Sequence, residues 1–284
     1  MTAENTLDRF AGVPWEPGAA KPDPVLVVEG VRRAFGGLVA VDVDHLEVQR
    51  GAITALIGPN GAGKTTFFNL LTNFDTPDAG TRRFEGQELS RVPAHRVASL
   101  GMVRTFQLTK SLSKMSVIDN MLLGATHQRG ESLRRALLPF TWREQESANI
   151  ARADELLERF KLSHMRNEYA GTLSGGQRKL LEMARALMVE PTMVMLDEPM
   201  AGVNPALKQS LLDHVKGLRD LGMTVLFVEH DMDMVQEISD WVVVMAEGRI
   251  IAEGPPSSIG ENQAVVDAYL GAHHDAPLDL GDDR

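Results

Sequence analysis

The sequence predicts an α/β fold with a mainly parallel sheet flanked by helices, and two observations support this prediction. In the second half of the chain, short apolar segments alternate with amphipathic helical segments, a pattern typical of a parallel sheet covered by helices. In the first half, an apolar strand at residues 53–57 leads into a glycine-rich loop and then a helix at residues 65–71. Strand, glycine-rich loop and helix in this order are the context of a phosphate-binding loop.

The other elements follow from the same two patterns. Short apolar runs predict strands, and segments with one apolar face predict helices. Before residue 112 these patterns predict strands at residues 25–28, 46–48 and 53–57 and the helix at 65–71. After residue 172 they predict a helix at 177–189, a strand at 193–196, a helix at 205–220, a strand at 223–228, a helix at 231–238 and a strand pair within 241–252.

The middle of the chain has a different character. There Ala151, Leu156, Leu157 and Phe160 are spaced as on one face of a helix, among charged residues. This periodicity predicts a helical insertion over about residues 108–172, although an ordinary run of surface helices fits the same pattern.

The two ends of the chain differ in composition from the part between them. Residues 1–23 contain several prolines and few apolar residues, which predicts a flexible N-terminal arm. Residues 273–284 are rich in Asp and Gly and predict a disordered acidic tail. We therefore expect one folded domain over residues 24–272.

Composition narrows the class of protein. The chain has 284 residues, a formal net charge of −10 and no cysteine. Disulfides and thiolate metal sites are thereby excluded, which fits a reducing compartment. The acidic balance argues against broad binding to nucleic acid, because phosphate backbones require clustered Lys and Arg.

Membrane insertion is not expected from the sequence. The strongest apolar runs, at residues 223–228 and 241–246, are far shorter than the roughly 20 residues that a membrane-spanning helix needs. Residues 1–10 lack the basic start and apolar core of a secretory signal. We expect a cytoplasmic protein that other chains anchor if it acts at a membrane.

The glycine-rich loop carries the strongest chemical signal. Residues 58–66 match the phosphate-binding pattern G-x-x-x-x-G-K-[ST]. Glycines let backbone N–H groups surround phosphates, and the following helix directs its positive end at the same anion. Lys64 can reach the β- and γ-phosphates, and the Thr65 hydroxyl can ligate Mg²⁺. A chance glycine-rich turn is the alternative. The candidate nucleotide-binding residues of this loop are Gly58, Pro59, Asn60, Gly61, Ala62, Gly63, Lys64, Thr65 and Thr66.

Two acids follow a predicted strand further along the chain. Asp197 and Glu198 end the apolar run at 193–196, and open α/β sheets bind ligands at the carboxyl ends of their strands. Beside a phosphate-binding loop, Asp197 would hold Mg²⁺ through water, and Glu198 would act as a general base or orient the attacking water. By itself, such a pair is more often part of a turn or a helix cap.

Three further candidates depend on their context. Gln107 and His230 each follow a predicted strand, where either side chain could contact the γ-phosphate. A single Gln is ordinarily a surface amide, and a single His is ordinarily structural. Phe35 could stack on an adenine ring, worth about 1–3 kcal/mol by analogy with base stacking, or could be a core aromatic.

A second glycine turn begins the helix predicted after residue 173. Its donors Ser174, Gly175 and Gly176, together with Gln177, predict a second anion site at a helix N-terminus. A helix capped by Ser174 is the alternative.

Together these motifs resemble the nucleotide-binding domain of ATP-binding cassette (ABC) proteins over about residues 25–272. The resemblance rests on six elements in order: residues 58–66, Gln107, residues 173–177, residues 193–198, residues 201–204 and His230. In that family they are the Walker A loop, the Q-loop, the signature, Walker B with its catalytic glutamate, the D-loop and the switch histidine. The resemblance implies a P-loop NTPase core with an antiparallel β subdomain and a helical subdomain at about residues 108–172. Lys64, Gln107, Glu198 and His230 would be catalytic. Thr65, Gln107 and Asp197 would hold Mg²⁺.

The resemblance also implies partners. Two such domains sandwich two ATP molecules, so that Ser174–Gln177 would close on the ATP held by a second ABC ATPase subunit, identical or related. The chain resembles the ATPases of branched-chain amino-acid importers in residues 35–41, 103–107, 195–205 and 228–232, and in the closing segments 253–255 and 268–271. This implies membrane permease subunits and, indirectly, a periplasmic or extracellular solute-binding protein. The chain would be peripheral to the cytoplasmic face of the membrane, with residues 108–117 contacting a permease.

Other functions stay open within this resemblance. Related ATPases serve urea, amide or lipopolysaccharide transport, and other ABC ATPases act on ribosomes or DNA. The acidic composition and the single cassette count against the last group. Asn204 replaces the Asp that many members carry in the D-loop, so contacts inferred from that Asp do not carry over unchanged.

Overall fold

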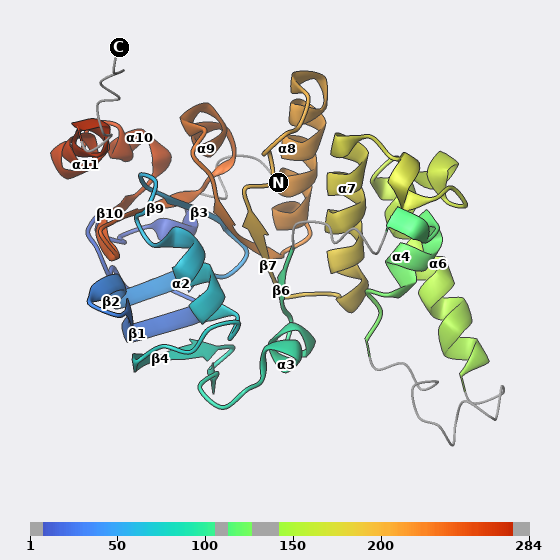
Figure 1. Ribbon diagram of the computed structural model, residues 1–284, viewed down its shortest axis with the longest axis horizontal. Coiled ribbons are helices and arrows are strands. Elements are labelled where there is room, and N and C mark those ends of the chain that lie inside the picture. Colours follow the sequence, from blue (N-terminus) through green and yellow to red (C-terminus); the bar gives the residue numbers. More distant parts are fainter. Residues whose placement is uncertain (1–7, 106–112, 127–141, 275–284) are drawn as a thin grey trace, which may run out of the picture. The chain divides into compact units, whose positions relative to one another are not determined.

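The computed structural model describes residues 8–105, 113–126 and 142–274 (Figure 1). The chain forms two compact units. Unit 1 comprises residues 1–91 and 228–284, and unit 2 comprises residues 92–227. Unit 1 therefore unites the two ends of the chain, whereas unit 2 is one continuous segment.

An antiparallel sheet forms the first part of unit 1. Its strand order is β2-β1-β4-β5, with bounds Pro24–Phe35 for β1, Leu38–Gln49 for β2, Ala79–Phe84 for β4 and Gln87–Glu88 for β5. Strand β1 is longer than the sequence predicts because residues 29–35 include charged side chains that lie on the solvent side of the sheet. The antiparallel β subdomain implied by the family resemblance is present.

The phosphate-binding loop follows the first strand of a second group of strands in unit 1. Strand β3 (Ile53–Ile57) runs parallel to β9 (Trp241–Ala246), which pairs with β10 (Arg249–Gly254) in the antiparallel sense. Every residue of β3 and β9 is buried, which explains their continuous apolar sequences. The helices of this unit are α2 (Lys64–Leu71), α9 (Met232–Ile238), α10 (Pro256–Ile259) and α11 (Gln263–His274), with a 3₁₀ turn η1 (Asp8–Phe10).

The described part of the N-terminal arm, which its composition predicts to be flexible, places three side chains in the interior of unit 1. Val13, Ala19 and Lys21 are buried. The predicted acidic tail lies almost wholly outside the described residues.

Unit 2 contains strands and the helical region. Its strands follow the order β8-β7-β6, with β6 (Met102–Arg104) parallel to β7 (Met193–Asp197). The boundary between the units falls within β8 (Thr224–Val228). The helices are α3 (Ala94–Ser99), α4 (Val117–Leu122), α6 (Arg143–Arg159), α7 (Gly175–Ala186) and α8 (Pro205–Asp220), with 3₁₀ turns η5 (Ser163–Met165), η6 (Ala170–Thr172) and η7 (Leu187–Val189).

Several predicted elements agree closely with these bounds. Helix α8 and strand β3 have the predicted limits, and β7 extends one residue further, to Asp197. Among the described helices, none combines the length and the hydropathy that a membrane-spanning segment requires.

Candidate functional site

The glycine-rich loop connects β3 to α2 in unit 1 and is closely surrounded by backbone. Gly58 has φ +150° and Gly63 has φ +96°. A Cβ at Gly58 would lie 1.9 Å from the carbonyl oxygen of Met245, and one at Gly63 would lie 2.2 Å from that of Ala40. Both positions therefore require glycine, and the loop backbone can approach a ligand on its open side.

The turn between β9 and β10 holds the middle of this loop. The N–H of Gly248 donates to the carbonyl of Ala62 at 3.0 Å, and the N–H of Asp42 donates to the carbonyl of Gly248 at 2.8 Å. The loop is thus fixed by hydrogen bonds to an element nearly two hundred residues away in sequence.

The first turn of α2 offers the groups that a phosphate needs. Helix α2 begins at Lys64 without a side-chain cap at Gly63, and the N-terminal turn of a helix attracts anions. Lys64 Nζ donates to the carbonyls of Gly58 at 2.7 Å and Pro59 at 2.8 Å. Thr65 is exposed. These residues fit a nucleoside triphosphate, because they combine glycines with close backbone, the N-terminal turn of a helix and an ammonium ion.

Phe35 lies at the end of β1, where the hairpin to β2 begins. Its side chain is 49% exposed. The guanidinium of Arg33 lies 4.7 Å from the ring centroid, so one face of the ring already has a cationic neighbour. Stacking of adenine on Phe35 remains a prediction.

In unit 2, the acidic pair lies at the end of β7 as the sequence predicts. Asp197 is the last residue of the strand, and its Oδ2 accepts a hydrogen bond from Nη2 of Arg104 at 2.6 Å. Glu198 follows with φ +45°, a left-handed conformation that is uncommon for a residue with a Cβ. Such strained positions cluster at active sites.

The second glycine turn is a capping box at the start of α7. Gln177 N donates to Ser174 Oγ at 3.3 Å, and Ser174 N donates to Gln177 Oε1 at 3.0 Å. The Ser-capped helix is therefore present. It leaves open whether the same residues also bind an anion. Gly176 is buried, and a Cβ there would lie 2.4 Å from Leu207 Cδ1 of α8.

His230 lies just after β8, in unit 1. Its side chain is 68% exposed and its Nδ1 lies 3.6 Å from Oε2 of the buried Glu229. Gln107 lies outside the described residues, so its role stays a prediction. Asn204 accepts backbone hydrogen bonds from Leu207 and Lys208 at the start of α8.

The sequence did not point to two neighbours of these motifs. Arg104 ends strand β6, and the surrounding sequence gave no sign of its pairing with Asp197. Burial raises the pKa of Tyr269 on α11, while the backbone of Gly58, the first glycine of the loop, acts in the opposite direction.

The metal site expected at these motifs needs few protein ligands. No group of three or more acidic or imidazole side chains that could hold a metal ion occurs within the described ranges. Mg²⁺ at a nucleotide does not require such a group, since that ion keeps several waters and binds one or two protein groups together with phosphates.

Comparisons with known proteins agree with these features. A family model described as ABC transporter matches residues 41–201, and one described as branched-chain amino acid ATP-binding cassette transporter matches residues 249–275. Similar proteins include a probable branched-chain amino acid transport ATP-binding protein, LivG, of Archaeoglobus fulgidus, 40% identical over 90% of this chain and 99% of that protein. The high-affinity branched-chain amino acid transport ATP-binding protein LivG of Escherichia coli K12 is 41% identical over 87% of this chain and 98% of that protein.

Solved structures give the same result. The ADP conformation of an ATP-binding cassette from an ABC transporter has a TM-score of 0.77 and 38% identity, covering 87% of this chain and 99% of that one. A nucleotide-free cassette has a TM-score of 0.76 and 38% identity, covering 87% and 98%. These likenesses confirm the predicted P-loop NTPase fold and the family resemblance. The chain therefore belongs to the ATP-binding cassette transporter family, as an ATP-binding protein of that family.

Proposed function

We propose that the chain is the ATP-hydrolysing subunit of an ABC importer for branched-chain or other amino acids. One observation carries the solute class: residues 249–275 match the model specific to branched-chain amino acid cassettes, in addition to the general match at residues 41–201. The named relatives, which align over most of their own length, support the same class. The reaction is hydrolysis of ATP to ADP and phosphate, coupled to solute translocation through separate permease subunits.

The proposed roles follow from the chemistry of each group. When bound, ATP with Mg²⁺ supplies the phosphoanhydride bond whose hydrolysis drives the transport cycle. Lys64 exchanges its bonds to the carbonyls of Gly58 and Pro59 for bonds to phosphate oxygens. Thr65 and Gln107 would ligate the metal, and Asp197 would hold it through water.

Other residues accept the proton and form hydrogen bonds at the γ-phosphate. Glu198 accepts a proton from the attacking water. His230 and Gln107 hydrogen-bond the water or the γ-phosphate. The residues from Ser174 to Gln177 close on the nucleotide of a second ATPase subunit, so that each site is completed by the partner.

A groove in unit 2 is the proposed contact with the permease. It encloses about 250 Å³ and includes Arg104 of β6, Leu123 after α4, and Glu182 and Arg185 of α7. Leu123 is 56% exposed and offers an apolar contact to a permease subunit. The first half of the predicted contact segment at residues 108–117, residues 108–112, lies outside the described residues.

Assembly and uptake test this proposal together. Purification of the chain from native membranes should recover its permease subunits, and Leu123→Asp should reduce that recovery because it puts a charge on the apolar contact. Leu221→Asp changes another half-exposed leucine of unit 2 and is the control. Cells that lack the chain should lose uptake of labelled leucine. Loss of urea or amide uptake instead would assign a related transport system.

A further inference from the structure

The N-terminal arm (residues 8–23) makes a buried ion pair with the C-terminal part of unit 1. Lys21 Nζ lies 2.9 Å from Oε2 of Glu253 on β10, and the two side chains are 1% and 0% exposed. The arm precedes both segments that the family models match. The function proposed above gives it no role.

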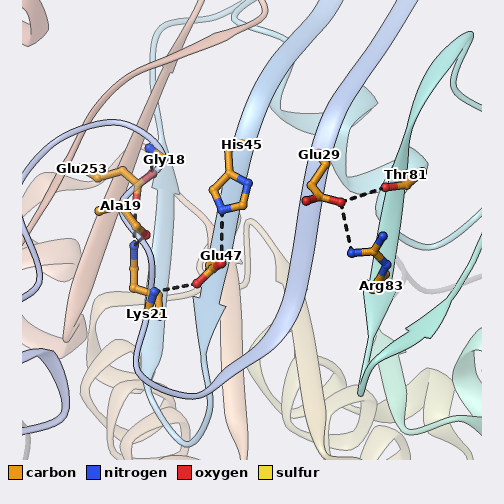
Figure 2. A network of polar contacts seen from close by, with 9 residues as sticks. All are labelled: Gly18, Ala19, Lys21, Glu29, His45, Glu47, Thr81, Arg83 and Glu253. Carbon is orange, nitrogen blue, oxygen red and sulfur yellow. Dashed lines mark hydrogen bonds and ion pairs between the residues drawn. The ribbon is translucent and has the colours of Figure 1, made fainter.

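Both side chains of this pair make further hydrogen bonds, some of which Figure 2 shows. Lys21 Nζ also donates to the carbonyl of Ala19 at 2.6 Å. The Oε1 of Glu253 accepts from the N–H of Gly18 at 2.8 Å, and its Oε2 accepts from Trp241 Nε1 at 3.0 Å. A buried ion pair of this kind holds its partners in one arrangement, because separating the charges leaves one of them unpaired in the interior.

Aromatic contacts fix the arm to the same place. The ring of Phe10 stacks on Trp241 with centroids 4.7 Å apart and an interplanar angle of 11°. The ammonium of Lys21 lies 4.8 Å from the centroid of the Trp241 ring. Trp241 is the first residue of β9 and is almost completely buried. The arm therefore contacts both strands of the β9–β10 hairpin.

The opposite end of this hairpin shapes the phosphate-binding loop. Met245, four residues after Trp241 on β9, places its carbonyl oxygen where a Cβ of Gly58 would lie, at 1.9 Å. The hairpin turn donates from Gly248 N to the carbonyl of Ala62 at 3.0 Å. A shift of the hairpin along its axis would move both contacts.

We propose that the N-terminal arm positions the phosphate-binding loop through the β9–β10 hairpin, and that Lys21 is the positioning residue. Attachment of the arm holds the hairpin, and the hairpin holds Gly58 and Ala62 in the conformation that accepts phosphates. The proposal rests on the assignment of residues 58–66 as the nucleotide loop. It assigns to the arm a part in ATP affinity rather than in the chemical step.

The test compares the full-length wild type with Lys21→Met, which keeps most of the apolar stem and removes the charge. ATP affinity is measured by calorimetry, and KM and kcat by steady-state hydrolysis, at a temperature where both proteins are folded. We expect Kd and KM for ATP to rise roughly 3- to 30-fold, the range for residues that couple to a site through contacts, with a smaller change in kcat. Arg83→Met is the matched control, because it removes an exposed ion pair with Glu29 in the same unit (Figure 2).

Further variants separate positioning from stability. Adding Glu253→Gln to Lys21→Met removes the unpaired buried charge and should restore part of the affinity for ATP. If Lys21→Met does not fold, Phe10→Leu loosens the stack on Trp241 without burying a charge, and it should raise Kd in the same direction. An unchanged Kd in the variant that folds would overturn the role of the arm. A wild type that does not bind ATP would instead refute the proposed function.

Discussion

Arg104 and Asp197 form a largely buried ion pair within unit 2, with Arg104 Nη2 2.6 Å from Asp197 Oδ2 and side chains 8% and 24% exposed. Strands β6 and β7 are parallel neighbours, and Arg104 lies opposite Met195. Because one carboxylate oxygen is engaged by the guanidinium, the orientation of Asp197 is fixed. Under the proposed function, the other oxygen would accept a hydrogen bond from a metal-bound water.

Replacing Arg104 should therefore weaken the response to Mg²⁺. Residues that orient a metal-binding group typically change metal affinity about 10- to 100-fold when they are lost. We expect Arg104→Met to raise the Mg²⁺ concentration for half-maximal ATPase activity by at least about 10-fold. Arg152→Met, which removes an exposed pair with Glu155 in the same unit, should have no such effect. An unchanged Mg²⁺ requirement in Arg104→Met would show that the pair is only structural.

We expect turnover to depend on Glu198 as the general base. Glu198→Gln keeps the size of the side chain and removes its basicity, so kcat should fall on the order of 10²-fold or more while ATP binding is retained. Glu190→Gln is the matched control, because Glu190 in unit 2 also has a positive φ, at +52°. Measurement of kcat and of ATP affinity decides the matter. Normal turnover in Glu198→Gln would remove Glu198 from the proposed mechanism.

The capping box of α7 allows a structural role of Ser174 to be separated from a role in binding. Ser174→Ala and Ser116→Ala each remove an N-cap oxygen, since Ser116 Oγ accepts from Asp119 N at 3.1 Å on α4. Each should lower the free energy of unfolding by about 1 kcal/mol in urea titrations. Only Ser174→Ala should lower ATPase activity, because the signature would act on the partner's nucleotide. Equal loss of activity in both variants would attribute the effect to stability.

Elements with a strong local pattern were predictable from the sequence. Strand β3 and helix α8 agree with their predicted limits, because a continuous apolar run and a regular helical periodicity do not depend on distant residues. The phosphate-binding loop was predictable because its residue pattern is contiguous and directly follows an apolar strand, although the backbone that crowds Gly58 and Gly63 comes from distant residues.

Features that depend on distant partners were not predictable. Lys21 and Glu253 are 232 residues apart, so the composition of the arm alone indicated flexibility. Arg104 and Asp197 are 93 residues apart, and neither side chain shows its partner in the sequence. The positive φ of Glu198 has no residue signal, since glycine or asparagine would ordinarily mark such a position.

Glu182 should make the stability of the protein depend on pH. The residue lies on α7 and is 4% exposed, and burial raises its pKa to about 7 from 4.5, although Lys179 and Arg185 act in the opposite direction. Between these two values the folded protein binds more protons than the unfolded chain. The free energy of unfolding should therefore fall as pH rises through this window and level off above it. The total decrease from this group should be up to about 3 kcal/mol.

Glu182→Gln cannot ionise and should lose this slope. The free energy of unfolding of the variant minus that of the wild type should be larger at pH 8 than at pH 5. At pH 8 only the wild type must bury a charged carboxylate. Urea unfolding of both proteins at the two pH values measures the difference, and Glu158→Gln, at an exposed position of α6, should follow the wild type. If the free energy of unfolding of the wild type and of Glu182→Gln changed in parallel with pH, the carboxyl group would be solvated or paired in solution and would ionise with its ordinary pKa.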